Sequence, residues 1–200
     1  MTCHFSSDIK YLAIDAATSS GWALVEGQRR GPVRAIEYGT LRLHQRAAIQ
    51  DQIRALLGRL SVRPDVLAVE SPVPVYERGK LRNHAGYATA VGISAIWRDT
   101  LRAYYGIAAE EVYPSAWQAA VLRGLSGDTK RRAAAAVAEI YGLRDVQHDA
   151  ADALCLAYWC HTRHGWLLEV SDDDKRAGVK RALNAYFLRR GGAVGVDARR

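Results

Sequence analysis

Four carboxylates in this chain occupy positions where an acidic side chain is costly unless it has a partner. Asp15 and Glu70 each end an apolar run that is typical of a buried strand. Asp149 and Asp152 are three residues apart, a spacing that places both side chains on one face of a helix. Charges at the edge of a core lose hydration, and gathered carboxylates repel one another. A divalent cation resolves both conflicts, so the pattern predicts a metal-dependent enzyme.

The predicted ligands indicate which metal such a site would hold. Carboxylate oxygens are hard ligands, which favour Mg²⁺ or Mn²⁺ over zinc. Each acid also has a simpler interpretation. Asp149 and Asp152 suit the positive end of a helix dipole, and Asp15 and Glu70 could be solvated strand ends. The four positions taken together favour the metal site.

The composition favours a single globular domain with a polyanionic partner. The chain has 200 residues, of which 49% are hydrophobic, and a formal net charge of +7 with a pI near 9.5. Because acids are concentrated in the predicted metal site, the excess of Lys and Arg must lie elsewhere on the surface, where it would attract nucleic acid. No apolar run approaches the ~20 residues that span a bilayer, so we expect no membrane partner.

The N-terminus and the cysteines indicate a cytoplasmic protein. The first residues lack the basic start and the apolar stretch of a signal peptide. Cys155 and Cys160 lie in an apolar helical stretch without zinc-type spacing, and Cys3 makes the number of cysteines odd. Buried thiols in a reducing cytosol are the simplest interpretation.

The elements that would carry the four acids follow from periodicity and turn signals. Apolar runs and turn residues predict strands at 10–17, 20–26, 33–41, 65–70 and 110–113. Helical spacing and capping residues predict helices near 49–60, over 83–105, after Ser115, from Asp128 to Gly142, and from about His148 to His164. A three-strand meander followed by alternating strands and helices implies an α/β fold with a mixed five-stranded sheet flanked by helices.

This order of elements, with an acid in the first strand, a Glu ending the fourth and a late Asp-x-x-Asp helix, resembles the ribonuclease H-like fold. Within that fold, residues 8–164 are most similar to the RuvC-type Holliday junction resolvases. The turn Gly124-Leu-Ser-Gly-Asp-Thr-Lys130 resembles the family's glycine-bearing turn with a lysine. The long helix with Gly86 and Gly92 resembles the helix on which those resolvases dimerise.

The resemblance implies roles for individual side chains. The family's metal-binding acids fall on Asp15, Glu70, Asp149 and Asp152, which would hold two Mg²⁺ or Mn²⁺ ions about 3.5–4 Å apart. Such a pair activates water and stabilises the leaving 3′ oxygen, and the family's cleavage leaves a 5′-phosphate and a 3′-hydroxyl. Lys130 would add positive charge near the scissile phosphate. Some relatives use His in place of the third acid, so the choice of His148 or Asp149 as the inward ligand stays open.

The segment after Glu70 departs from the family's pattern. The family often places an aromatic residue three positions after the Glu, where this chain has Val73, and Tyr76 lies farther along. The same loop carries three cations and a glycine, a mixture that suits phosphate contact and base stacking. We therefore expect DNA binding at Tyr76, Arg78, Lys80 and Arg82, with a solvated basic loop as the alternative.

The resemblance also implies how the chain is divided and assembled. Residues 1–165 would form the ribonuclease H-like nuclease domain, and residues 166–200 a basic C-terminal helix and tail. A homodimer through the 83–105 helix would supply two active sites related by a two-fold axis, as paired nicks require. Tyr87, Val91 and Trp97 give that helix more apolar area than one side of a small domain needs.

These expectations predict a structure-specific endonuclease that resolves four-way (Holliday) or other branched DNA. A ribonuclease H-like nuclease acting on RNA–DNA hybrids or flaps would keep the chemistry and change the substrate. A non-catalytic branched-DNA-binding protein is disfavoured by the complete set of acids. A sugar-kinase-like or actin-like ATPase, suggested by the segment from Asp15 to Gly21, is disfavoured because the chain lacks a second glycine-rich phosphate loop.

Overall fold

The computed structural model describes residues 8–28, 31–44, 48–77 and 80–167. The chain divides into one unit that ends at Thr162 and a second unit from Arg163 onward. The expected C-terminal helix and tail lie outside the described residues apart from positions 166 and 167, so the boundary after residue 165 stays a prediction. None of the described helices is long and apolar enough to cross a membrane.

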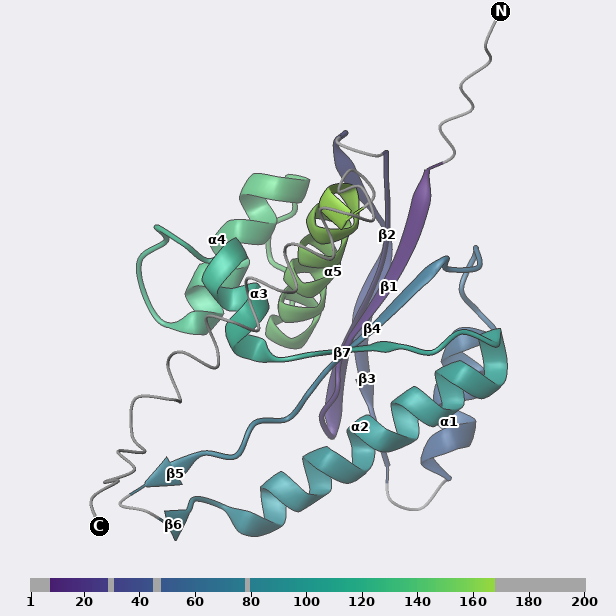
Figure 1. Ribbon diagram of the computed structural model, residues 1–200, viewed down its shortest axis with the longest axis vertical. Coiled ribbons are helices and arrows are strands. Elements are labelled where there is room, and N and C mark those ends of the chain that lie inside the picture. The colour runs from purple at the N-terminus through teal and green to yellow at the C-terminus, as the bar shows by residue number, and fades with distance from the viewer. Residues whose placement is uncertain (1–7, 29–30, 45–47, 78–79, 168–200) are drawn as a thin grey trace, which may run out of the picture. The chain divides into compact units, whose positions relative to one another are not determined.

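A five-stranded mixed sheet organises the first unit (Figure 1). Its strands are β1 (Ile9–Asp15), β2 (Ser19–Gly27), β3 (Val33–Arg42), β4 (Val66–Glu70) and β7 (Glu110–Val112), in the spatial order β3-β2-β1-β4-β7. The first three strands form the predicted antiparallel meander, whereas β4 pairs parallel with β1, and β7 parallel with β4. The predicted α/β fold with a mixed five-stranded sheet is therefore confirmed.

Helices cover both faces of the sheet (Figure 1). One layer consists of α1 (Ile49–Leu57) and α2 (His84–Tyr105), and the other of α3 (Pro114–Val121), α4 (Thr129–Tyr141) and α5 (His148–Leu167). In β1, Leu12 and Ile14 pack in the α1–α2 layer, whereas Tyr11 and Ala13 pack in the opposite layer. Because both faces are buried, the central strands are continuously apolar, and an acid at a strand end stands out in the sequence.

The helix ends confirm two predicted signals and correct a third. The side chain of Asp128 accepts a hydrogen bond from the N–H of Arg131 and caps α4, which ends at Gly142 with a φ of 68°. The prediction that Ser115 caps α3 is wrong, because the helix already begins at Pro114. Proline has a fixed φ and no N–H, which suits the first helical position.

The long helix α2 has an exposed beginning and a buried end. From Ile93 onward it contributes buried side chains to the core, whereas Val91 is 41% exposed. Trp97 is fully buried, and its indole N–H donates a hydrogen bond to Ser20 Oγ at 3.0 Å. The expectation that Trp97 adds apolar area to an outer face is therefore wrong, because this ring fills the space between the helix and the sheet.

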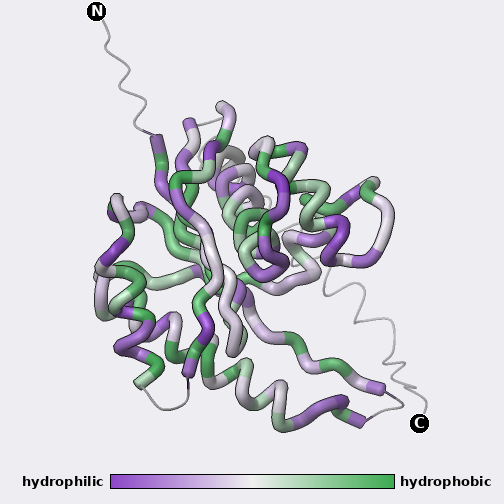
Figure 2. The backbone as a smooth tube through the Cα atoms, turned by 180° about the vertical axis from the view of Figure 1, so that it is seen from behind, coloured by the Kyte–Doolittle hydropathy of each residue, from purple (hydrophilic) through white to green (hydrophobic). Residues whose placement is uncertain are grey.

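A short hairpin that the sequence pattern does not indicate lies between β4 and α2. Its strands are β5 (Tyr76–Glu77) and β6 (Lys80–Leu81), which pair antiparallel. Strands of two residues are too short to show a period of two, so no alternation indicates them. Asn83 then adopts a φ of 50°, and its side chain accepts a hydrogen bond from the N–H of Gly86 at the start of α2. Figure 2 shows hydrophilic residues where the helix begins.

Candidate metal centre

Asp15 and Glu70 lie at the carboxyl ends of the neighbouring parallel strands β1 and β4. The register pairs Ile14 with Val69, and each acid is the next residue along its strand. Side chains alternate between the faces of a sheet, so both acids lie on the face of Ala13 and Ala68, which belongs to the α3–α4–α5 layer. The topology therefore brings the first two predicted ligands to one edge and one face.

The first turn of α5 lies directly against β2, beside these two acids. Gly21 pairs with Asp15 in the antiparallel register. A Cβ at Gly21 would lie 1.8 Å from the backbone oxygen of Asp149, so the close approach of the helix requires a glycine here. The hydroxyl of Ser19, also on β2, donates a hydrogen bond of 2.6 Å to Oδ2 of Asp149. These contacts bring the acid-bearing turn of α5 onto the face that carries Asp15.

The four carboxylates are named here the acid cluster, and burial together with repulsion between them raises the pKa values of Asp15, Glu70 and Asp152. Burial is the main reason why the pKa of Asp15 lies well above its usual range, and repulsion from the other three acids adds to it. Burial raises the pKa of Glu70 to about 7, against an opposing hydrogen bond from Trp117 and with a further rise from Asp152. Burial and the charge of Asp149 raise the pKa of Asp152 to about 6. Such mutual repulsion means that the side chains share one electrostatic environment.

Hydrogen bonding leaves part of the acid cluster unsatisfied. Oδ1 of Asp152 is buried without a hydrogen-bond partner, whereas Asp149 and Glu70 each accept a hydrogen bond. A divalent cation would supply the missing interaction and offset the repulsion, so the donor set fits Mg²⁺ or Mn²⁺. Within the described ranges, no three His, Cys, Asp or Glu side chains are placed to enclose an ion. The metal-binding role of the four acids therefore stays a prediction.

His148 and Lys130 flank the acid cluster. His148 is exposed, whereas Asp149 is partly buried and bonded to Ser19, which favours Asp149 as the inward side chain of the pair. Lys130 is exposed near the start of α4, and the charges of His148 and Lys130 both oppose the rise in the pKa of Asp152. Lys130 therefore lies within electrostatic reach of the acids.

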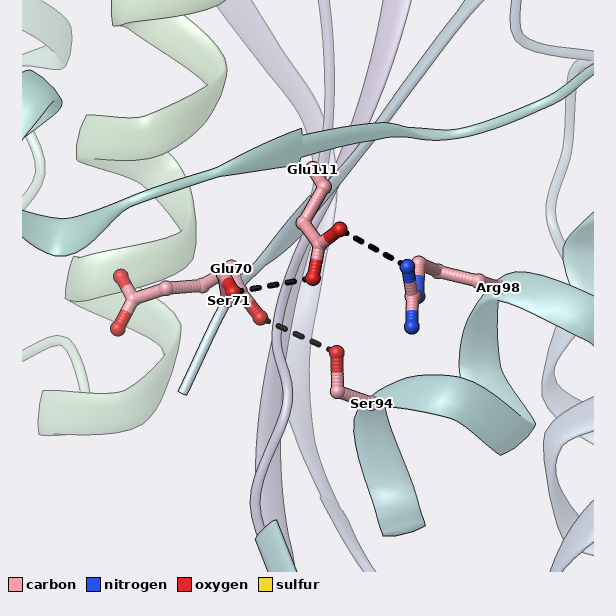
Figure 3. A network of polar contacts seen from close by, with 5 residues as sticks. All are labelled: Glu70, Ser71, Ser94, Arg98 and Glu111. Atoms are coloured by element: carbon pink, nitrogen blue, oxygen red, sulfur yellow. Dashed lines mark hydrogen bonds and ion pairs between the residues drawn. The ribbon is translucent and has the colours of Figure 1, made fainter. Parts of the chain in front are cut away.

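Hydrogen bonds also hold the end of β4 on the α2 side of the sheet (Figure 3). Ser71 Oγ donates a hydrogen bond of 3.0 Å to Oε1 of Glu111, and Oε2 of Glu111 accepts one of 2.9 Å from Arg98. Ser94 Oγ donates to the backbone oxygen of Glu70 at 3.4 Å. Figure 3 shows the Glu70 side chain pointing away from this network. The network therefore holds the backbone at Glu70 and leaves its carboxylate to the opposite face.

Three contributors to the site were not predicted from the sequence. The indole N–H of Trp117 donates a hydrogen bond of 2.6 Å to Oε2 of Glu70, and Ser19 and Gly21 hold the start of α5. The sequence could have indicated Ser19 and Gly21, because a strand that follows a tight turn pairs antiparallel with the strand that carries Asp15. No sequence pattern indicates the role of Trp117, because its contact with Glu70 depends on how α3 packs against the sheet.

The predicted DNA-binding residues Tyr76, Arg78, Lys80 and Arg82 are named here the hairpin surface, and three of them, Tyr76, Lys80 and Arg82, lie on or beside the hairpin. Tyr76 is 65% exposed, and Lys80 and Arg82 are exposed as well. Arg82 lies 3.9 Å from Glu77, a pair that solvent screens on both sides. Arg78 lies outside the described residues. An exposed aromatic ring among exposed cations suits phosphate and base contacts, and the DNA-binding role stays a prediction.

Two solved structures share the fold of this chain. One is a structure of T. thermophilus RuvC in complex with a Holliday junction substrate, with a TM-score of 0.56 and 19% sequence identity; the match covers 76% of this chain and 92% of that chain. The other is a Thermus thermophilus RuvC structure with a TM-score of 0.55 and 21% identity, covering 78% and 97%. The mixed sheet flanked by helices is thus the ribonuclease H-like fold of RuvC, as predicted.

Sequence comparison identifies the family. No protein-family model matches the chain. The crossover junction endodeoxyribonuclease RuvC of Frankia alni is 30% identical over 165 residues, which cover 78% of this chain and 79% of that relative. The match therefore includes most of both proteins. On this identity and coverage, the chain belongs to the RuvC family of crossover junction endodeoxyribonucleases.

Proposed function

We propose that this chain is an endonuclease that resolves four-way (Holliday) or other branched DNA by hydrolysing phosphodiester bonds. The observation that carries the proposal is the acid cluster, in which carboxylates on adjacent strands and on α5 share one environment and leave a buried oxygen of Asp152 without a partner. A relative is named as a crossover junction endodeoxyribonuclease, and one similar structure holds a Holliday junction substrate. Both names favour branched DNA over an RNA–DNA hybrid.

Two Mg²⁺ or Mn²⁺ ions per active site would be held by Asp15, Glu70, Asp149 and Asp152. When bound, the ions would activate the attacking water and stabilise the leaving 3′ oxygen, which gives 5′-phosphate and 3′-hydroxyl ends. The chain itself prepares the ligands. Ser19 orients Asp149 by a hydrogen bond, and the contact at Gly21 sets the distance between α5 and the sheet.

Two further side chains complete the proposed site. Asp149, rather than His148, is the inward ligand, which its burial and its bond to Ser19 support. Lys130 supplies positive charge for the scissile phosphate, a role that its influence on the pKa of Asp152 supports.

The hairpin surface would bind the DNA next to the cleaved strand. Arg78, Lys80 and Arg82 contact backbone phosphates, and Tyr76 stacks on a base where the junction strands are unpaired. The high exposure of the Tyr76 residue supports this role, because a ring that is largely exposed to solvent has surface available for a base. The formal net charge of +7 favours the association of the whole chain with DNA.

The protein would act as a homodimer through the exposed beginning of α2. Two nicks placed symmetrically across a four-way junction require two active sites related by a two-fold axis. Val91 is exposed and Tyr87 is partly exposed on this part of the helix, which offers apolar surface to a second copy. Light scattering at tens of micromolar protein, with and without junction DNA, would measure the mass directly. A strict monomer under both conditions would contradict paired nicking.

Cleavage of four substrates tests the proposed function as a whole. A synthetic four-way junction, a Y-fork, a linear duplex and an RNA–DNA hybrid are each incubated with the protein in Mg²⁺ and in EDTA. We expect nicks in the junction, in Mg²⁺ only, and products that a ligase can seal because they carry 5′-phosphate and 3′-hydroxyl ends. Preferred cleavage of the hybrid would favour a ribonuclease H-like activity instead. Junction binding without cleavage of any substrate would favour a non-catalytic binding protein.

A further inference from the structure

Trp117 is a core residue whose polar atom contacts a predicted ligand. The side chain is 1% exposed and packs in the α3–α4–α5 layer with residues such as Leu122. Its indole nitrogen can only donate a hydrogen bond, so a buried tryptophan needs an acceptor. The acceptor is Oε2 of Glu70, at 2.6 Å, a distance slightly shorter than is usual for an N–H bonded to a carboxylate.

A short connection in the chain fixes where this donor lies. Val112 ends β7 and pairs with Glu70 in the parallel register. Tyr113 is the single residue between that strand and Pro114, which begins α3. The first turn of α3 therefore starts beside Glu70, and Trp117 projects from that turn. Because close packing holds the ring, the indole N–H is a fixed point to which the flexible carboxylate adapts.

The other end of Glu70 is held independently. Ser94 on α2 donates to the backbone oxygen of Glu70, and the next residue, Ser71, is bonded through Glu111 to Arg98. Figure 3 shows this network on the side of the strand away from the Glu70 carboxylate. Backbone and carboxylate are thus held from opposite layers, which restricts the rotamers between them.

We infer that Trp117 is a positioning residue whose indole N–H orients the Glu70 carboxylate for metal binding. The inference rests on the proposed metal site and adds a supporting contact to it. With one lone pair of Oε2 engaged by the indole, the orientation of the carboxylate is restrained while Oε1 stays available as an acceptor. Hydrogen bonds that orient a ligating carboxylate contribute to metal affinity because the ligand no longer loses rotamer freedom on binding.

Trp117 also fills space in the core. To separate packing from hydrogen bonding, the test must remove the indole N–H and keep the shape of the ring. Benzothienylalanine does so, because sulfur replaces the indole N–H in an otherwise isosteric ring. The full-length protein is prepared with this residue at position 117 and, separately, at position 97. Trp97 is the matched control, since it is equally buried but donates to the hydroxyl of Ser20 instead of an acid. Trp117→Phe, which ordinary mutagenesis can produce, is added as a second variant that lacks the indole N–H.

Calorimetric titration with Mn²⁺ at near-neutral pH gives the affinity, and thermal unfolding of the same samples gives the stability. We expect about tenfold weaker Mn²⁺ binding with benzothienylalanine at position 117, and wild-type affinity with the same residue at position 97. Trp117→Phe should weaken binding at least as much. Wild-type Mn²⁺ affinity with the isostere at position 117 would overturn the inference. Absence of Mn²⁺ binding by the unmodified protein would instead contradict the proposed metal site and remove the basis of the inference.

Discussion

The acid cluster and the hairpin surface use charge in opposite ways. The acid cluster gathers like charges at the edge of a buried sheet, where desolvation and repulsion raise the pKa values of three carboxylates. The hairpin surface displays cations and the Tyr76 ring in solvent. Burial makes each interaction strong and sensitive to a single proton or cation, whereas exposure makes each contact weak, additive and dependent on salt.

The proposed function gives the two regions different roles, catalysis for the acid cluster and DNA binding for the hairpin surface. A reactive site needs ligands held at fixed distances, which the strand register and the packing of α5 against β2 provide. A surface that binds flexible branched DNA needs range and adaptability, which long exposed side chains provide. Changes in the acid cluster should therefore alter cleavage and metal binding, while changes in the hairpin surface should alter affinity for DNA.

The largest effect should come from removing the cations of the hairpin surface. In the proposed homodimer, replacement of Arg78, Lys80 and Arg82 by Ala would remove six proposed phosphate contacts, each worth about −0.9 in the slope of log affinity against log salt. Salt titrations of junction binding should therefore show a slope that is smaller by five to six, or roughly a thousandfold less weakening between 50 and 200 mM salt. The double variant Arg54→Ala/Arg59→Ala, with one arginine in α1 and the other just after its end, is the control. An unchanged slope in the triple variant would place the DNA-binding surface elsewhere.

A methyl group at Gly21 should affect the acid cluster alone. In Gly21→Ala the new Cβ would displace the first turn of α5, because it meets the Asp149 backbone at 1.8 Å. A shift of the order of 1 Å in a catalytic group can lower the rate about a hundredfold, whereas junction affinity should be unchanged. Gly58→Ala is the control, since its Cβ would meet atoms only at 3.4 Å and beyond. Equal cleavage by both variants would mean that the position of α5 does not matter for catalysis.

The raised pKa values predict how pH affects stability in the absence of metal. Carboxyl groups whose pKa is higher in the folded state, such as Glu70 at about 7 and Asp152 at about 6, stabilise the fold at low pH. That contribution is lost as pH rises through these values, and for Glu70 it is on the order of 3 kcal/mol.

Urea unfolding in EDTA between pH 4 and 8 should therefore show a free energy of unfolding that falls with rising pH. A saturating divalent cation should restore the lost stability, because it binds the ionised carboxylates. Glu70→Gln should flatten the profile in EDTA. A wild-type profile that rises across this range without metal would show that the acids are not mutually repelling in solution.

The smallest predicted effect concerns the exposed ring of the hairpin surface. Tyr76→Ala should weaken binding of a four-way junction by ~1–3 kcal/mol and leave the salt slope unchanged, because stacking contributes little to counterion release. Binding isotherms at several salt concentrations, with the linear duplex for comparison, would measure both quantities. Tyr38→Ala, at an exposed tyrosine of β3, is the control. Equal losses for junction and duplex would argue against stacking at unpaired bases.

The acids at two strand ends and the limits of α4 could be predicted from the sequence because they have local causes. Asp15 and Glu70 stand out as acids that end apolar runs, and Asp128 and Gly142 mark the limits of α4. The contact between Trp117 and Glu70 could not be predicted, because it joins residues that are brought together only by the packing of α3.

The sequence indicated neither the hairpin nor the burial of Trp97. The strands of the hairpin are too short for a periodic signal. Trp97 belongs to a helix that is apolar on more than one side, so spacing alone did not distinguish its buried face from its exposed one. Local chemistry thus predicts the ligand types, whereas the groups that support those ligands depend on tertiary packing.

The central claim, that catalysis lies in the acid cluster and DNA recognition in the hairpin surface, is tested most directly by a crossed experiment. Asp152→Asn, Asp15→Asn and the triple hairpin variant are each assayed for junction binding in Ca²⁺ and for single-turnover cleavage in Mg²⁺ at saturating protein. We predict wild-type binding with cleavage at least about a thousandfold slower for the two amide variants, and weak binding with near wild-type cleavage at saturation for the triple variant. Wild-type cleavage by Asp152→Asn, or a triple variant that binds normally but cannot cleave, would contradict the account.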